Sequence, residues 1–189
     1  MEIILNTKVF IAGSITIKNI DIKVKERIKN IIDQHFEVLV GDADGVDSSV
    51  QKILNELNAN SVRVFCSGQD PRNNLGGWSV ESVFTLHKEG SRAFFTAKDV
   101  KMAEAADFGL MIWDTKSTGT LSNVIELLSA KKKSVVFINK DKLFKNVGSV
   151  EQLEELVSLM SDHAKNKAEE KIRLSEKIAR LKNEQLNMF

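Results

Sequence analysis

The sequence predicts an α/β fold: a Rossmann-like, doubly wound parallel sheet followed by a long amphipathic helix at the C-terminal end. Short runs of almost continuously apolar residues alternate with longer segments whose apolar residues recur at helical spacing. Such apolar runs are typical of strands that are buried on both faces. Because crossovers between parallel strands are right-handed, this alternation favours one sheet with helices on both of its faces.

The first part of the chain supplies three of the expected strands and two of the helices. We expect strands at 8–12, 36–40 and 61–66, each of which is short and rich in apolar residues. Segments 21–35 and 46–57 carry apolar residues three or four positions apart, with charged or polar residues in between. That spacing indicates helices with one face toward water.

The second part of the chain continues the same alternation. A short strand is expected at 93–95 and a helix at 97–106. An apolar strand at 108–113, a helix at 119–130 and a last strand at 134–138 follow. Strands and helices in this order are the repeating unit of a parallel sheet.

The composition changes after about residue 150, which divides the chain into a sheet domain, 1–148, and a helical extension, 149–189. The extension is dominated by Glu, Lys, Leu, Asn and Ala and contains neither Gly nor Pro. Its apolar residues keep an imperfect helical spacing, so we expect a long helix with a break near Asp162. The helix could pack on its own domain, pair with a second copy or fray in water. We expect a homo-oligomer.

Charge and cysteine content exclude several classes of function. The 189 residues carry a formal net charge of +1, whereas a general nucleic-acid binder would carry a basic excess. Cys66 is the only cysteine, so neither an intramolecular disulfide nor a multi-cysteine zinc site can form. Because no leader and no membrane-spanning apolar run is found, we expect a soluble cytoplasmic protein. The three histidines lack the spacing of a metal site or a catalytic triad, and no metal or cofactor is expected.

Polar, glycine-bearing segments follow four of the expected strands. They are Gly13-Ser14, Gly41 to Asp47, Cys66 to Trp78, and Asp114 to Thr120. In a parallel sheet, these segments share the edge at the carboxyl ends of the strands, where ligands bind. Free N–H groups at helix starts attract anions to the same edge. The sequence therefore predicts a ligand site there.

The segment G-D-A-D-G-V-D places two glycines and three aspartates between two apolar stretches, and a calcium loop is the first alternative. A loop of the EF-hand type needs glycine at its sixth position and glutamate at its twelfth. Counted from Asp42, those positions are Asp47 and Ile53, which excludes this reading.

Gly41 and Gly45 instead allow a sharp turn that approaches a ligand closely. Two roles stay open for Asp44 and Asp47. Either carboxylate could cap the following helix, or it could accept a hydrogen bond from a ribose hydroxyl.

The segment S-T-G-T, from Ser117 to Thr120, is the best candidate for binding a phosphate. It supplies three hydroxyl groups, and Gly119 allows close approach at the positive end of a helix. Gly13 and Ser14 are expected to hold the same phosphate.

The segment R-N-N-L-G-G-W is long and polar for a simple connection. Arg72 could grip a phosphate, Asn73 could contact the base or ribose, and Trp78 could stack on a base. Alternatively, the segment folds over the end of the sheet and Trp78 fills a gap. We expect Cys66 to be a small buried apolar residue and not a nucleophile.

Several of these segments resemble motifs of one family. G-D-A-D-G-V-D-S-S-V-Q is similar to the G-x-A-x-G-x-D helix start of the SLOG superfamily, a Rossmann-like group that includes DprA and the LOG phosphoribohydrolases. Residues 98–107 and 119–123 resemble the paired LOG signature, R-K-x-x-M-x-x-x-A-D and G-G-x-G-T-x-x-E. Residues 66–78 resemble a small bacterial and phage-borne SLOG-like group. The resemblance covers about residues 8–138.

The resemblance implies a site for nucleotides or nucleotide-derived signals. LOG enzymes cleave the bond between base and ribose 5-phosphate with an arginine and a glutamate, which match Lys98 and Asn123 here. Lysine lacks the arginine fork, and asparagine cannot take a proton or act as a carboxylate. Glu126 lies three residues further on. Binding is therefore expected in preference to hydrolysis.

The leading hypothesis is a module that senses or sequesters a small nucleotide, such as an ADP-ribose-like signal or a nucleoside monophosphate. In the alternative, an N-glycosidic hydrolase or transferase would use Asp114 or Glu126 as its carboxylate, together with Lys98. A structural adaptor that acts through its C-terminal helix is a third class. The residues expected to contact the ligand are Gly13, Ser14, Gly41, Asp44, Asp47, Arg72, Asn73, Trp78, Lys98, Ser117, Gly119, Thr120 and Asn123.

Overall fold

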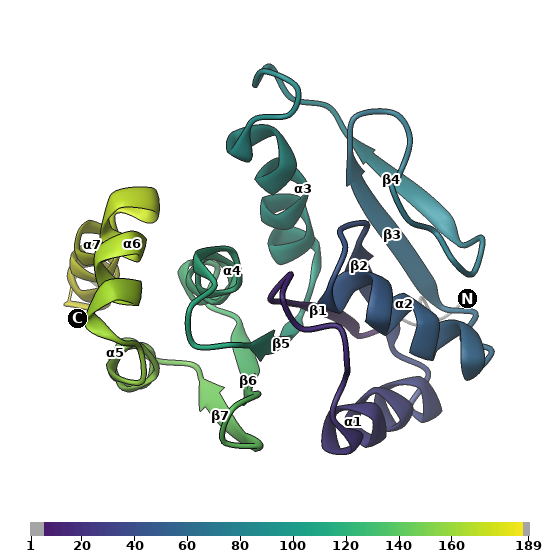
Figure 1. Ribbon diagram of the computed structural model, residues 1–189, viewed down its shortest axis with the longest axis horizontal. Coiled ribbons are helices and arrows are strands. Elements are labelled where there is room, and N and C mark those ends of the chain that lie inside the picture. Colours follow the sequence, from purple (N-terminus) through teal and green to yellow (C-terminus); the bar gives the residue numbers. More distant parts are fainter. Residues whose placement is uncertain (1–5, 187–189) are drawn as a thin grey trace.

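A computed structural model describes residues 6–186, which form a seven-stranded sheet with helices on both faces (Figure 1). The strand order is β4-β3-β2-β1-β5-β6-β7, and every neighbouring pair is parallel except β6 and β7. The predicted Rossmann-like, doubly wound α/β class is confirmed. The strands are β1 (Lys8–Gly13), β2 (Glu37–Gly41), β3 (Val62–Ser67), β4 (Ser79–Val83), β5 (Phe108–Trp113), β6 (Lys133–Ile138) and β7 (Leu143–Val147).

The two faces of the sheet carry separate apolar cores. On one face, α1 (Ile22–Asp33) and α2 (Val46–Glu56) pack over β1, β2 and β3. On the other, α3 (Arg92–Ala105) and α4 (Thr118–Ser129) share a core with three further helices. Those helices are α5 (Val150–Ser158), α6 (Asp162–Ile172) and α7 (Leu174–Leu186). In Figure 1, α4 lies between α3 and the α6–α7 pair.

Two edge strands were not predicted, and one predicted strand is wrong. Residues 93–95 lie in the first turn of α3, because the Ser91 side chain caps that helix by accepting from the Phe94 N–H. The edge strand next to β3 is instead β4, whose sequence S-V-E-S-V is largely exposed. β7 is also a partly exposed edge strand, which returns antiparallel to β6. Edge strands lack the continuous apolar runs on which the prediction depended.

The C-terminal extension is three short helices instead of one long helix. The predicted break near Asp162 is confirmed, since Ser161 caps α6 by accepting from the Ala164 N–H. A second break follows at Arg173, which has a left-handed backbone with φ of 51°. Buried residues of all three helices join the α3–α4 core, so the extension packs on its own sheet. Self-association stays a prediction.

Truncation of a buried leucine in α5 should measure how far the extension stabilises the sheet. Leu156 is 1% exposed, and Leu156→Ala is expected to lower the free energy of unfolding by about 2–5 kcal/mol. Leu186→Ala, at a site that is 74% exposed, is the matched control and should change it by less than about 0.5 kcal/mol. Urea denaturation measures both. Equal effects would mean that the extension does not share the core.

Candidate functional site

The sheet reverses its winding between β1 and β5, and this fixes where loops diverge. From β1 the chain adds β2, β3 and β4 on one side, and α3 then carries it back to β5 on the other side of β1. The loops after β1 and β5 therefore leave the carboxyl edge in opposite directions, toward α1 and α4. Such a switch point is where open α/β sheets bind ligands.

A buried ionic cluster lies at the carboxyl end of β2. Its centre is Lys98 of α3, whose side chain is only 4% exposed. The Lys98 Nζ atom lies 2.8 Å from Asp99 Oδ1, 3.7 Å from Asp47 Oδ2 and 3.9 Å from Asp42 Oδ1. Arg72 completes the cluster through Asp42. The charge of Lys98 is thus matched by carboxylates and enclosed, so it is not available to neutralise a phosphate as predicted.

Gly41 makes room for this cluster. A methyl group at Gly41 would overlap the Asp47 carboxylate and lie 2.5 Å from Lys98 Nζ. Only a residue without a side chain lets Lys98, from the α3 face, meet Asp47, from the start of α2. Gly41 therefore serves the ionic cluster, whereas the sequence analysis placed it against a ligand.

Two buried carboxylates of the cluster, Asp42 and Asp47, have pKa values that are shifted in opposite directions. Burial raises the pKa of Asp47 to about 6, although the charge of Lys98 opposes the shift. Burial acts in the same direction on Asp42, but the hydrogen bonds from Arg72 prevail and lower its pKa. For Lys98, burial opposes the charged form, and the surrounding aspartates raise its pKa nonetheless.

Arg72 ties the loop after β3 to the loop after β2. Its backbone N–H and its Nε atom donate to Asp42 Oδ2, both at 3.0 Å, and its Nη2 atom donates to Asp42 Oδ1 at 2.8 Å. The guanidinium also lies 4.6 Å from the ring centre of Phe95. This fork grips a carboxylate of the protein, in place of the predicted phosphate. Asn73 likewise donates to the Asp42 carbonyl oxygen and to Asp44 Oδ1.

Buried Gln51 of α2 was not singled out from the sequence. Its Nε2 atom donates to the carbonyl oxygens of Gly41 and Asn73, and its Oε1 atom accepts from the Leu75 N–H. It therefore holds the two loops together. A polar residue on the apolar side of a helix is the signal that could have identified it.

Trp78 lies at the opposite edge of the sheet from the predicted ligand. It directly precedes β4, which is parallel to β3, and so it is placed at the amino ends of the strands. Its Nε1–H donates to the Ala59 carbonyl oxygen at 2.7 Å, and its ring packs against the α1–α2 core. The stacking role is wrong for this reason, and Trp78 fills a gap.

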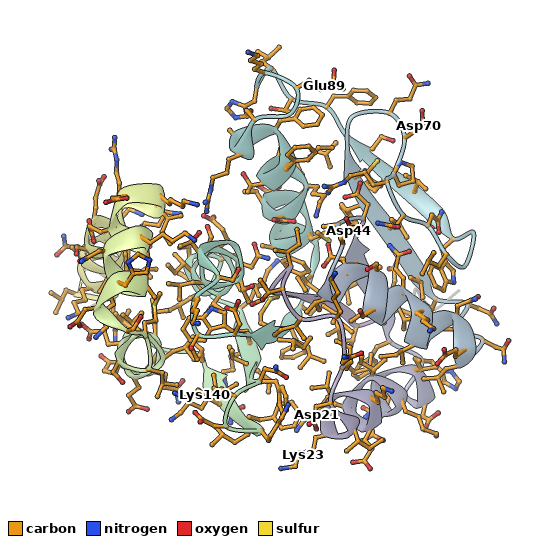
Figure 2. The ribbon with its side chains drawn as sticks, viewed as in Figure 1. Asp21, Lys23, Asp44, Asp70, Glu89 and Lys140 are labelled. Carbon is orange, nitrogen blue, oxygen red and sulfur yellow. The ribbon has the colours of Figure 1, made fainter. Side chains whose placement is uncertain are left out.

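Neither Asp44 nor Asp47 caps α2. The N-cap is Gly45, with φ of 77° and no side-chain hydrogen bond. Asp47 is buried beneath the loop and accepts from the Ala43 N–H, so a ribose cannot reach it as proposed. Asp44 is exposed in the loop after β2 (Figure 2). It is the carboxylate of this loop that a ligand can reach.

The start of α4 presents N–H and hydroxyl groups of the kind that attract anions at helix starts. Ser117 is the N-cap, and its side-chain and backbone oxygens accept from the N–H groups of Thr120 and Leu121. The N–H groups of Thr118 and Gly119 find no acceptor within residues 6–186. A methyl group at Gly119 would meet only Ser117 Oγ, at 3.9 Å, so the space in front of this helix end is open. We call these four residues, Ser117 to Thr120, the α4 niche.

Arg92 places a positive charge at the α4 niche. Both its Nη1 and Nη2 atoms donate to Thr118 Oγ1 at 3.2 Å. Among residues 6–186 no carboxylate lies within 4.0 Å of this guanidinium. Arg92 was not predicted as a site residue, because the residues that follow it were expected to form a strand and not to begin a helix.

Of the two residues predicted to share this phosphate, Ser14 borders the α4 niche and Gly13 does not. Ser14 Oγ lies 3.4 Å from Thr120 Oγ1 and accepts from the Asp114 N–H. Gly13 is needed for packing instead of phosphate binding, since a methyl group there would lie 2.8 Å from Val46 Cγ2.

Asp114 is occupied by the loops that flank the switch point. One oxygen accepts from the N–H groups of Lys116 and Ser117, and the other accepts from Thr16 Oγ1 at 2.8 Å. Burial opposes the charged form, but these hydrogen bonds prevail and lower the pKa of Asp114. The carboxylate thus fastens the β5–α4 loop to the β1–α1 loop, and its catalytic role stays a prediction.

A cleft of about 380 Å³ opens between α3, α4 and the corner where α6 meets α7. We call it the interhelical cleft. Arg92, Asp99, Asn123 and Glu126 line it from α3 and α4. Asn123 lies four residues after Gly119 and therefore on the same side of α4. The α4 niche and this cleft are thus neighbours along one helix.

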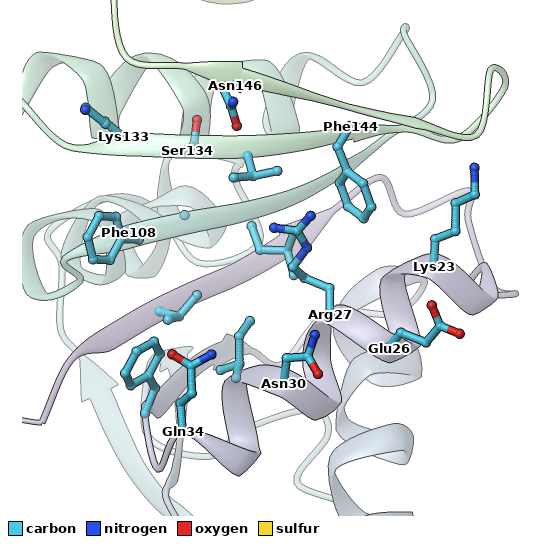
Figure 3. Close-up of a pocket in the computed structure, with 16 residues that line it drawn as sticks. Lys23, Glu26, Arg27, Asn30, Gln34, Phe108, Lys133, Ser134, Phe144 and Asn146 are labelled. Carbon is cyan, nitrogen blue, oxygen red and sulfur yellow. The ribbon is translucent and has the colours of Figure 1, made fainter.

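A larger cavity, of about 700 Å³, is drawn in Figure 3 and shares no lining residue with the α4 niche or the interhelical cleft. It runs between α1 and the strands β5, β6 and β7, on the half of the α1–α2 face that no described helix covers. Arg27 of α1 reaches over the ring of Phe144, 4.4 Å from its centre. None of the predicted site residues lines this cavity.

Comparison with known proteins adds no family assignment. No protein-family model matches the chain, and no curated protein matches its sequence. The resemblance to the SLOG superfamily stays a prediction. Within residues 6–186, no helix has the length and apolar character needed to cross a bilayer. No group of side chains in that range is arranged to hold a metal ion.

Removal of Lys98 should leave buried carboxylates without a partner. Lys98→Met is expected to lower the free energy of unfolding by about 3–5 kcal/mol. The double variant Lys98→Met, Asp47→Asn should recover part of that loss, because one uncompensated charge is gone. Urea denaturation of both variants at pH 7 measures the difference. Additive effects would show that Lys98 and Asp47 are not coupled.

Asp47 should make the folded protein less stable as the pH rises. Its pKa is about 6 in the folded state and near 3.8 in the unfolded state. Between these values the unfolded chain loses the proton first, so the free energy of unfolding falls. Relative to Asp47→Asn, the wild type should therefore lose about 2–3 kcal/mol between pH 4 and pH 7. Asp70→Asn, on an exposed loop, is the control. A constant difference between wild type and Asp47→Asn would contradict the shift.

Proposed function

We propose that the protein binds a small nucleotide or nucleotide-derived signal at the carboxyl edge of its sheet, as a sensor or sequestering protein. The observation that carries the proposal is the α4 niche. Two N–H groups that have no acceptor among residues 6–186, an open space at Gly119 and the guanidinium of Arg92 converge there. A helix start of this kind favours an anion, and a guanidinium suits a phosphate in particular.

A ribose can be accommodated along the same rim. Gly45 packs against the Ile15 backbone, so the loop after β2 adjoins the loop after β1, which in turn contacts the α4 niche through Ser14. Exposed Asp44 is held on one side by Asn73, and its other oxygen is free to accept a hydroxyl hydrogen bond. A phosphate at the niche and a ribose near Asp44 are consistent with a nucleotide that follows this rim.

The contacts of the candidate acids favour binding over hydrolysis. Asp114 is fastened between two loops. Asn123 stands where the LOG resemblance expects a glutamate, and a carboxamide cannot act as an acid, base or nucleophile. We therefore expect the ligand to be held without cleavage.

One observation keeps an N-glycosidic hydrolase or transferase as a second candidate. Glu126 lines the interhelical cleft, where its Oε1 atom lies 3.2 Å from Lys177 Nζ. A carboxylate in that position could stabilise the positive charge that develops on a sugar during bond cleavage. Release of free base from a nucleoside 5'-monophosphate, abolished in Glu126→Gln, would establish this activity.

Arg92 provides the test of the proposed function. Isothermal titration calorimetry with AMP and ADP-ribose should show binding by the wild type. Arg92→Ala should weaken it about 10–100-fold, because a hydrogen-bonded charge pair to phosphate is lost. Lys52→Ala, which removes an exposed charge from α2, is the matched control and should bind as the wild type does. The proposal fails if neither nucleotide binds at millimolar concentration, or if Arg92→Ala and Lys52→Ala behave alike.

A further inference from the structure

The carboxamide of Asn123 is open to the interhelical cleft and makes no hydrogen bond to the described residues. The residue is 7% exposed, and no hydrogen bond to its side chain is found within residues 6–186. Neither amide atom is among the fully buried unpaired ones, so both can be reached from the cavity, and the amide can donate to or accept from a ligand there. The cavity in question is the interhelical cleft.

Cations outnumber carboxylates around this cleft. Its two carboxylates are both matched by a cation, Glu126 by Lys177 at 3.2 Å and Asp99 by Lys98 at 2.8 Å. Lys171, at the end of α6, has no carboxylate within 4.0 Å among residues 6–186. Arg92, on the other side of the cleft, likewise has no carboxylate within 4.0 Å among these residues. The cleft therefore carries uncompensated positive charge from both α3 and α6.

The lining of the cleft suits a phosphoryl group better than a base. No aromatic ring lines it, and its apolar part is limited to Ala93, Val100 and Ile172. A carboxamide N–H together with an ammonium group can donate to phosphate oxygens. A carboxylate at position 123 would instead repel such a group.

The spacing of the two anion sites fits neighbouring phosphoryl groups. Gly119 of the niche and Asn123 of the cleft are four residues apart on α4, which corresponds to about 6 Å along the helix axis. Arg92 borders both, since it donates to Thr118 and also lines the cleft. One diphosphate bridge could therefore contact both places.

We infer that the interhelical cleft is a second phosphoryl subsite, formed by Asn123 and Lys171, and that the ligand is a nucleotide with a diphosphate bridge. The inference rests on the proposed function for the first phosphoryl group. It gives the C-terminal helices a part in ligand binding, because α6 supplies the cation. Nucleoside monophosphates would then occupy the α4 niche alone.

Calorimetry of the full chain with AMP and ADP-ribose tests the preference for two phosphoryl groups. The wild type should bind ADP-ribose at least about tenfold more tightly than AMP. Lys171→Ala should remove most of that preference and leave the affinity for AMP within about twofold. Lys52→Ala again serves as the control for a lost positive charge. Equal affinity for the two nucleotides, or equal behaviour of Lys171→Ala and Lys52→Ala, would overturn the inference while the nucleotide function stands.

Titration with inorganic pyrophosphate separates the subsite from the choice of nucleotide. In ¹H–¹⁵N NMR spectra, pyrophosphate should shift the side-chain amide signals of Asn123 in the wild type and not in Lys171→Ala. If this shift occurs although no nucleotide binds, the subsite is supported and the proposed function fails. An unmoved Asn123 signal overturns the subsite, whatever the nucleotides do.

Discussion

The buried charge of Lys98 is the interaction on which the carboxyl edge depends. One ammonium group, reaching across the end of β2, holds carboxylates from three segments: Asp42 after the strand, Asp47 at the start of α2 and Asp99 on α3 itself. Its desolvation is offset only because the three carboxylates surround it at short distance. The loops on both faces of the sheet are thereby fixed in one arrangement.

This cluster decides which charged groups remain for a ligand. Because Arg72 and Lys98 are matched by Asp42 and its neighbours, the loop after β2 offers little net positive charge. Arg92, which has no carboxylate within 4.0 Å among residues 6–186, lies instead at the start of α4. In the proposed function, the acidic loop accepts a hydrogen bond from a ribose hydroxyl, because its carboxylates would repel a phosphate, and the phosphate binds at the α4 niche.

The sequence predicted the central strands and the edge at which loops gather, and it failed where neighbours decide the outcome. Buried parallel strands are continuously apolar and easily recognised, but the exposed strands β4 and β7 carry no such signal. Gly119 was correctly placed at a helix start. The role of Lys98 could not be predicted, because burial and the approach of Asp47 depend on tertiary packing. Trp78 was misplaced because β4 was not predicted. The segment before β4 runs from the carboxyl edge to the amino edge of the sheet, where Trp78 lies.

The central claim is that a phosphate binds at the start of α4. The most direct measurement is a titration of ¹⁵N-labelled protein with AMP, following the backbone amide signals of Thr118 and Gly119. Both N–H groups lack an acceptor within residues 6–186, so a bound phosphate should move these two signals more than any others and to lower field. Signals that stay in place at saturating nucleotide, or that move only near the cavity between α1 and β7, would contradict the account.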